Sequence, residues 1–290
     1  MKDFMQAQDL LAALNFSQRK RIVCVDIKEA YLDPSAESTQ GLRSMNSEIM
    51  LTGAECAALS QMDFQTDFDH KTIRLLLKMT LEGLLKEGND VWPRIAEKLS
   101  NALREQLSLE IEAEGIVEFF GYTAMSIIPR VEDGKILRRP GLRRWIEFLR
   151  SEEIDHCIVC SAPRLYSWQL MQRWGIQPWT PLFGGEIAAK GKWAYKPKAD
   201  PYINTLRSML QRFDGLVVVI DNPRNIVDPV VQLSSLGYEV CAVTFAEQDG
   251  LTTQMEIQEG LSEYGSSADD LVSNVLVLES EQGFLPLLKQ

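Results

Sequence analysis

The feature that most constrains the fold is a series of short, almost wholly apolar runs, each separated from the next by polar turns and amphipathic segments. The runs lie at residues 21–26, 155–161, 216–221, 239–244 and 274–278. Strands buried on both faces of a parallel sheet are typically apolar along their whole length, whereas half-solvated strands alternate. The helix candidates are Gly141 to Ser151, Leu165 to Trp174, Pro201 to Phe213 and Asn225 to Leu236. The sequence therefore predicts an α/β fold on a parallel sheet.

One long segment interrupts this alternation. From about Pro34 to Met125 no comparable apolar run occurs, while 71–87 and 91–114 have the apolar periodicity of helices. We therefore expect a helical insertion, a cap subdomain, at residues 34–125. The α/β core is then discontinuous and consists of residues 1–33 and 126–290.

Charge and hydropathy exclude several classes of partner. The 290 residues include 30 Lys and Arg against 41 Asp and Glu, a net charge of −11, and the pI is about 4.9. Because nucleic-acid binding usually needs a basic surface, no nucleic-acid partner is expected. No apolar stretch approaches the roughly 20 residues that cross a membrane. The N-terminal segment also lacks the form of a secretion signal. We expect a soluble, cytoplasmic protein without a membrane partner.

The five cysteines fit that compartment, because an odd number without a signal peptide favours free thiols. Cys157 and Cys160 form a CxxC pattern inside one of the predicted strands. Residues three apart on a strand point to opposite faces, so the pair is poorly placed to hold a metal or a redox centre. We expect both to be core residues.

Polar side chains stand where the predicted strands end. Asp26, Ser161 and Asp221 close the first three runs, and Lys196 lies in a Lys-Pro segment that precedes the third run. Parallel sheets bind ligands beyond the carboxyl ends of their strands. One carboxylate there can attack phosphorus, the hydroxyl and the ammonium can bind the transferring oxygens, and the other carboxylate can hold Mg²⁺.

In this order the motifs resemble those of the haloacid dehalogenase-like (HAD) superfamily. They are Val23-Cys-Val-Asp26, Ile158-Val-Cys-Ser161, Lys196-Pro-Lys-Ala-Asp-Pro-Tyr202 and Asp221-Asn-Pro-Arg-Asn225. The segments 139–149 and 270–288 are also similar to the superfamily's helix before the second motif and to its last strand and helix. The spacing of 135 residues between Asp26 and Ser161 resembles members whose cap follows the first motif.

The resemblance implies a Rossmann-like core and a Mg²⁺-dependent phosphatase that acts on a small phosphorylated metabolite. It implies an aspartyl-phosphate on Asp26, catalytic roles for Ser161 and Lys196, and Mg²⁺ ligands at Asp26, Asp221 and Asn225. Two alternatives stay open at this point. Lys198 competes with Lys196 for the role of the ammonium, and Asn225 is also a good N-cap for the following helix. Neither the substrate nor the oligomeric state follows from the motifs.

The first motif departs from the superfamily's pattern at Lys28. Phosphatases of this superfamily carry a second Asp there, which acts as acid and then base. A Lys with its ordinary pKa of about 10.4 donates a proton only reluctantly and adds positive charge beside Asp26. Lys28 either changes the catalysis or forms an ion pair with Asp26. Such an ion pair would mimic the bound cation and leave the site inactive. In the second case the chain is a catalytically impaired binding or regulatory module.

A third hypothesis is a dehalogenase or phosphonate hydrolase. Relatives of those kinds also lack the second Asp, although they do not normally carry a Lys at that position. This hypothesis therefore ranks below the phosphatase and the binding module.

Overall fold

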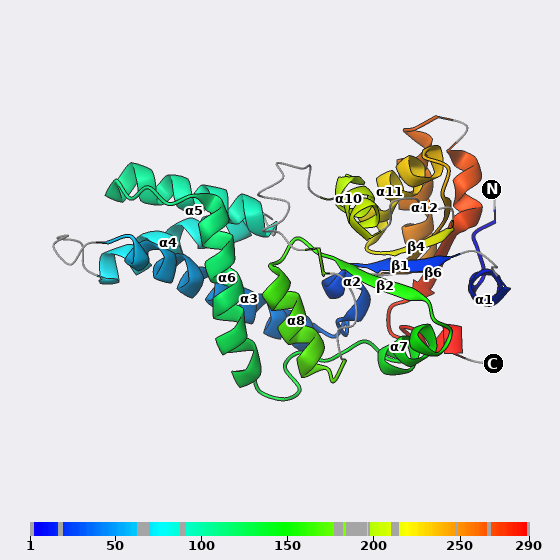
Figure 1. The fold of residues 1–290 in the computed structure, drawn as a ribbon, viewed down its shortest axis with the longest axis horizontal. Coiled ribbons are helices and arrows are strands. Elements are labelled where there is room, and N and C mark those ends of the chain that lie inside the picture. The colour runs from blue at the N-terminus through cyan, green and yellow to red at the C-terminus, as the bar shows by residue number, and fades with distance from the viewer. Residues whose placement is uncertain are drawn as a thin grey trace.

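The computed structural model describes residues 3–16, 20–62, 70–87, 91–176, 182–183, 196, 198–209, 215–246, 249–265 and 268–288. Its centre is a six-stranded sheet (Figure 1). The strands are β1 (Arg21–Val25), β2 (Asp155–Val159), β3 (Leu182–Phe183), β4 (Leu216–Ile220), β5 (Glu239–Ala246) and β6 (Val275–Glu279). All neighbouring strands are parallel, in the order β3-β2-β1-β4-β5-β6. The predicted α/β, Rossmann-like fold is confirmed.

Two hydrophobic clusters cover the two faces of the sheet. On β1, Val23 and Val25 belong to one cluster, while Ile22 and Cys24 belong to the other. The Ile22 face is covered by α10 (Asp200–Met209), α11 (Pro223–Ser235) and α12 (Gly250–Ser262). The Val23 face is covered by α1 (Ala7–Phe16), α7 (Leu142–Ser151) and the 3-10 helix η3 (Leu285–Leu288). Burial on both faces explains why these strands are apolar throughout.

The chain between β1 and β2 is helical. It forms α2 (Ile27–Tyr31), α3 (Ala36–Ser60), α4 (His70–Lys86), α5 (Trp92–Leu107) and α6 (Ala113–Ile127). The 3-10 helix η1 (Ile128–Arg130) follows, and α8 (Arg164–Arg173) packs on α6 after β2. In Figure 1, α4 and α5 project away from the sheet, whereas α3 reaches back to the ends of the strands.

One helical segment differs from the expected one. The periodic segment 91–114 is two elements rather than one, because Ser108 ends α5 in a left-handed conformation with φ of 54°. A new helix, α6, then starts at Ala113 and ends at Ile127.

The entry and exit of this helical segment are fastened to one another. The N–H of Asp33 donates to the carbonyl of Leu137, and the N–H of Arg139 donates to that of Tyr31. Gly41 in α3 lies so close to the returning chain that a Cβ atom there would stand 2.1 Å from the carbonyl oxygen of Lys135. These contacts fix the first turns of α3 beside the end of β1.

Four of the five cysteines are buried, and Cys56 is exposed. Cys157 belongs to the cluster on one face of the sheet and Cys160 to the cluster on the other. The expectation that the CxxC pair points to opposite faces is therefore confirmed. Among the described residues, no helix is both long enough and apolar enough to cross a membrane.

Candidate active site

Two strand ends and one lysine form the centre of the site. Asp26 follows β1, Asp221 follows β4, and the Nζ atom of Lys196 lies 2.8 Å from Asp26 Oδ2 and 2.5 Å from Asp221 Oδ2. The Asp26 side chain is 10% exposed, that of Lys196 is 9% exposed and that of Asp221 is fully buried. The structure thus brings together three of the residues expected from the motifs, with one ammonium bridging two carboxylates.

The orientation of Asp221 is fixed by four donors. Its Oδ1 accepts the N–H of Asn222 at 2.7 Å and the side-chain amide of Asn225 at 3.1 Å. Its Oδ2 accepts from Lys196 and from the hydroxyl of Tyr202. The N-cap of α11 is Asn222, whose side chain accepts the N–H of Asn225. The side chain of Asn225 therefore serves Asp221 rather than the helix cap.

Burial and charge act against each other in this cluster. Burial alone would lower the pKa of Lys196, but Asp221 and Asp26 raise that pKa well above its usual value. Burial raises the pKa of Asp221, and Lys196 opposes that rise. Burial and the neighbouring Asp221 carboxylate hold the pKa of Tyr202 well above its usual value. Lys196 is therefore a permanent cation that compensates the two carboxylates.

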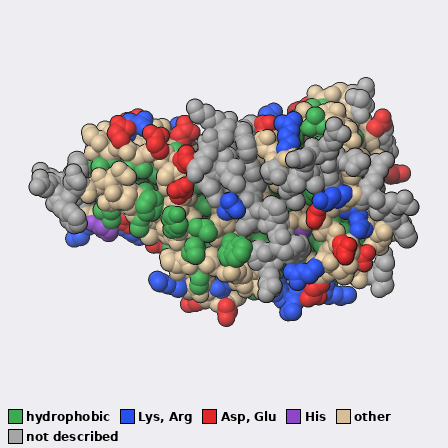
Figure 2. All heavy atoms as spheres, in the orientation of Figure 1, with side chains coloured by type: hydrophobic (Ala, Val, Ile, Leu, Met, Phe, Trp, Pro, Cys, Tyr) green, Lys and Arg blue, Asp and Glu red, His purple; other side chains and the backbone are tan. Residues whose placement is uncertain are grey.

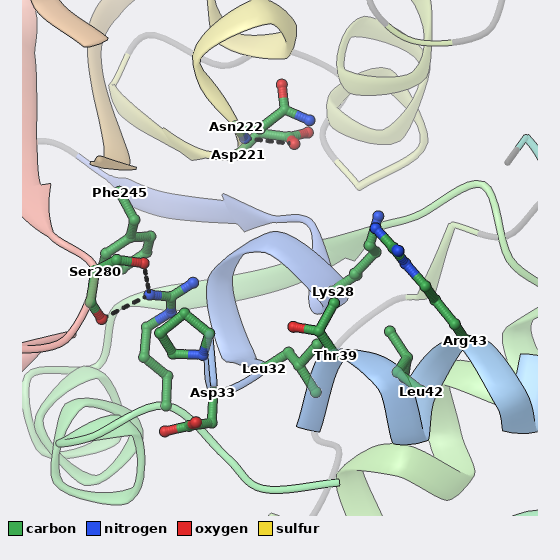
Figure 3. Close-up of a pocket in the computed structure, with 12 residues that line it drawn as sticks. Lys28, Leu32, Asp33, Thr39, Leu42, Arg43, Asp221, Asn222, Phe245 and Ser280 are labelled. Carbon is green, nitrogen blue, oxygen red and sulfur yellow. Dashed lines mark hydrogen bonds between the residues drawn. The ribbon is translucent and has the colours of Figure 1, made fainter. Parts of the chain in front are cut away.

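Lys28 contributes to the site in two ways. Its backbone N–H donates to Asp26 Oδ1 at 2.9 Å, whereas Lys196 donates to the other oxygen, Oδ2. Its exposed side chain lines a pocket of about 300 Å³ that Asp221 also lines (Figure 3). In the view of Figure 3, the side chains of Lys28 and Arg43 extend toward the same side of the pocket.

Ser161 is placed beyond the end of β2, as expected, but it is not joined to the cluster. It is half-buried, and its hydroxyl makes no hydrogen bond within the described part of the chain. The thiol of Cys160, the preceding residue, is influenced by the cluster. Burial raises the pKa of Cys160 to about 12, and the charge of Asp26 contributes to that rise. Lys198, the competing lysine, is exposed and lines a different cavity.

Sequence reasoning missed Tyr202 and Arg43. Tyr202 lies in the first turn of α10, six residues after Lys196, and its buried hydroxyl donates to Asp221. The sequence signal for Tyr202 was its place at the end of the Lys-Pro motif. Arg43 had no signal, since it reaches the pocket only because α3 packs against the strand ends. The sequence also contains a pair of aspartates with DxD spacing, Asp67 and Asp69, which lie outside the described residues.

The donor set fits Mg²⁺. The carboxylates of Asp26 and Asp221 already reach one cationic atom, the Lys196 nitrogen, and Asn225 adds an amide beside them. Mg²⁺ typically takes one or two carboxylates and keeps several waters. The described residues contain no cluster of three or more His, Cys, Asp or Glu side chains of metal-binding geometry. A Mg²⁺ ion held by these residues would therefore take its remaining ligands from water.

No protein-family model matches the sequence, and no curated protein matches it. Solved structures do match. The chain is similar to L-2-haloacid dehalogenase from Xanthobacter autotrophicus (13% identity, 93% of this chain and 98% of that chain, TM-score 0.43). It is similar to β-phosphoglucomutase from Clostridium difficile (13%, 91% and 92%, TM-score 0.43). It is also similar to CbbY from Rhodobacter sphaeroides in complex with phosphate (13%, 91% and 96%, TM-score 0.45).

At these identities and TM-scores the likenesses transfer no activity or ligand to this chain. What this chain can do chemically therefore follows from its own residues at the ends of its strands.

Proposed function

We propose that the chain is a hydrolase of small phosphate monoesters in which Asp26 attacks phosphorus. The observation that carries this proposal is the ammonium of Lys196, held between the buried carboxylates of Asp26 and Asp221. A carboxylate at the end of a parallel strand can act as a nucleophile. A fixed cation beside it reduces the repulsion between the carboxylate and an approaching phosphate dianion.

The reaction has two displacements. An oxygen of Asp26 bonds to phosphorus and the ester P–O bond breaks, so the leaving oxygen must take up a proton. Water then attacks the phosphorus of the aspartyl-phosphate, releases inorganic phosphate and restores the carboxylate. Lys196 holds Asp26 in position and offsets the charge of the phosphoryl oxygens, and Ser161 supplies a hydroxyl for one of those oxygens. A Mg²⁺ ion held by Asp26, Asp221 and Asn225 would supply further neutralisation of that charge.

Protonation of the leaving group is the weak step. Lys28 stands where the superfamily's phosphatases have their acid, and an acid of that kind contributes roughly 100- to 10,000-fold. Asp33 does not replace it, because Figure 3 places Asp33 at the opposite end of the pocket from Asp221. Turnover of alkyl phosphates is expected to be slow, and esters with good leaving groups, which need no proton, are expected to react faster.

The helices from residues 34 to 125 act in this proposal as a cap. The position of α3 supports this role, because Thr39, Leu42 and Arg43 of α3 line the same pocket as Asp221. The free cysteines support a reducing, cytoplasmic location.

Lys28 also favours a second candidate, a binding module that keeps the fold without turnover. Its side chain, which lines the same pocket as Asp221, would then help to hold an anion that the protein does not cleave. The kinetic comparison below separates this candidate from the hydrolase.

The test is a phosphate-ester panel assayed with Mg²⁺ on wild type, Asp26→Asn and Lys28→Asp. Asp26→Asn should abolish turnover, and Lys28→Asp should raise it because it restores a carboxylic acid and removes a cation. Lys98→Asp, which makes the same charge change on an exposed face of α5, is the control for net charge. Turnover that survives Asp26→Asn would defeat the mechanism. Inactivity of every variant, together with no Mg²⁺ binding, would support the binding module.

A further inference from the structure

One buried carboxylate outside the Asp26 cluster takes no part in the steps of the proposed reaction. Asp228 lies in α11 and is 7% exposed. Its Oδ2 accepts the backbone N–H of Ala199 at 2.6 Å, and its Oδ1 accepts the hydroxyl of Tyr264 at 2.6 Å. Among the described residues, no Lys or Arg side chain forms an ion pair with Asp228. Because burial of a carboxylate is costly, these two hydrogen bonds are what stabilises Asp228 in the interior.

Ala199 connects Asp228 to the active site. It is buried and stands immediately before α10, where its carbonyl accepts the N–H groups of Tyr202 and Ile203. It also follows Lys196 by three residues. Three residues of chain span at most about 11 Å, so a fixed Ala199 restricts the place from which the Lys196 side chain starts. Asp228 therefore acts on the backbone that carries Lys196.

One face of α11 holds both partners of the ion pair between Lys196 and Asp221. Asn225 and Asp228 are three residues apart, so they lie on the same side of the helix. Asn225 donates to Asp221 Oδ1 at 3.1 Å, whereas Asp228 holds the chain that follows Lys196. The Lys196 ammonium then lies 2.5 Å from Asp221 Oδ2. Since α10 also packs against α11 (Figure 1), both anchors of the ion pair belong to one helix.

The alternative is a local role, in which Asp228 stabilises only the start of α10. Asp249 has such a role at the start of α12, where it is the N-cap and accepts the N–H of Thr252 at 2.7 Å from an exposed position. N-caps are normally supplied by the residue at the start of the helix itself. Asp228 differs, because it is buried and comes from another helix, the one that also orients Asp221.

We propose that Asp228 is a positioning residue for Lys196. It fixes Ala199, and through Ala199 it holds the Lys196 ammonium between the two carboxylates of the site. Tyr264 keeps Asp228 oriented, because its hydroxyl occupies the second carboxylate oxygen. The inference rests on the proposed function, in which Lys196 holds Asp26 in position for attack. In this role Asp228 does not touch the substrate.

The experiment is a double-mutant cycle of Asp228→Leu and Lys196→Met, read by urea denaturation of the whole protein. If Asp228 acts through Lys196, Asp228→Leu should raise the unfolding equilibrium constant about tenfold less in Lys196→Met than in wild type. Asp249→Leu, which removes the cap of α12, is the matched control and should have the same effect in both backgrounds. Equal effects of Asp228→Leu in the two backgrounds would overturn the proposal. Tyr264→Phe, at a partly exposed position, replaces Asp228→Leu in the cycle if that variant does not fold.

Kinetics with an activated phosphate ester separate this role from the proposed function. Asp228→Leu should lower kcat about tenfold and change KM less, because a displaced ammonium no longer aligns Asp26 for attack. Asp228→Asn keeps an oxygen for the N–H of Ala199 and should restore most of kcat, while Asp249→Leu should leave it unchanged. If wild type does not turn the ester over but the stability cycle shows the coupling, the positioning role stands and the hydrolase fails. If wild type is active and Asp228→Leu keeps its kcat, the positioning role is refuted and the hydrolase stands.

Discussion

Lys196 is the residue on which the geometry of the site depends. It is the shared partner of Asp26 and Asp221, which are both buried. Removing one partner of a buried ionic cluster typically costs about 3–5 kcal/mol, because the remaining charges stay buried without compensation. We expect Lys196→Met to lower the free energy of unfolding by an amount of that order, measured by urea denaturation. Lys198→Met, two residues away and exposed, is the matched control and should change little.

The same variant tests the metal site without an activity assay. With the ammonium gone, Mg²⁺ is the remaining cation that can compensate Asp26 and Asp221. The melting temperature of Lys196→Met should therefore rise with Mg²⁺ by more than that of wild type. An equal response in the two proteins, or none in either, would count against these carboxylates as Mg²⁺ ligands.

His156 makes stability depend on pH. Its ring is buried beside the hydroxyl of Tyr31, and burial lowers its pKa to about 3, against about 6.5 for an unfolded chain. Between these values the unfolded state binds a proton that the folded state does not. The stabilising effect is complete above pH 6.5 and is lost as the pH falls toward 3, by roughly 1.4 kcal/mol per pH unit.

Urea denaturation between pH 7 and pH 4 measures this loss. His156→Asn should show a shallower loss of stability than wild type. His70→Asn, which removes the exposed histidine of α4, should keep the wild-type slope that His156 causes. Parallel curves for wild type and His156→Asn would show that the buried histidine does not titrate as described.

At the scale of single residues, the sequence predicts the positions that follow from backbone topology. Asp26 and Asp221 could be predicted because each ends an apolar strand, and strand order places those ends together. Arg43 and Tyr202 could not, since their positions depend on how helices pack, which no local pattern states. Asn225 was ambiguous until the structure showed Asn222 as the N-cap of α11.

At the scale of elements, the docking of α3 is the feature most open to test. A Cβ atom at Gly41 would stand 2.1 Å from the carbonyl oxygen of Lys135, whereas one at Gly83 in α4 would meet nothing within 4 Å. Gly41→Ala should therefore destabilise the protein by about 1–3 kcal/mol through overpacking. Gly83→Ala should stabilise it by roughly 0.5–1 kcal/mol, because alanine favours the helix.

Gly41→Ala should also lower turnover of phosphate esters, because Thr39, Leu42 and Arg43 of α3 line the pocket that Asp221 lines. The two alanine variants are compared by urea denaturation and by the phosphate-ester assay. If Gly41→Ala proved as stable as Gly83→Ala, with unchanged turnover, α3 would not be held against the returning chain as described.

The strands were the elements that sequence predicted best. Runs that are apolar on both faces have no helical period, so β1, β2, β4, β5 and β6 could be located to within a few residues. β3 was missed because two residues, Leu182 and Phe183, are too few to form a run. The break between α5 and α6 was missed because Ser108 adopts a left-handed conformation that serine rarely takes.

On the scale of the whole molecule, the sheet and the helices between β1 and β2 share one hydrophobic cluster. That cluster includes Val23 and Val25 of β1 together with Ile49 of α3 and Phe120 of α6. Figure 2 shows the surface over this arrangement, with acidic and basic side chains both present on the face in view. The expected basic footprint of a nucleic-acid binder is absent from the composition, whose net charge is −11. The small-molecule site that we propose lies where residues of α3 and of the strand ends line one pocket.

The most direct test of that account is to trap the covalent intermediate. The whole protein is mixed with Mg²⁺ and an activated phosphate ester, quenched in acid within the first turnover, and mapped by peptide mass spectrometry. We predict a phosphoryl group on Asp26 in wild type, a larger amount in Lys28→Asp if attack is accelerated more than hydrolysis, and none in Asp26→Asn. Turnover of the ester without any phosphoryl group on Asp26, or turnover that persists in Asp26→Asn, would contradict the account.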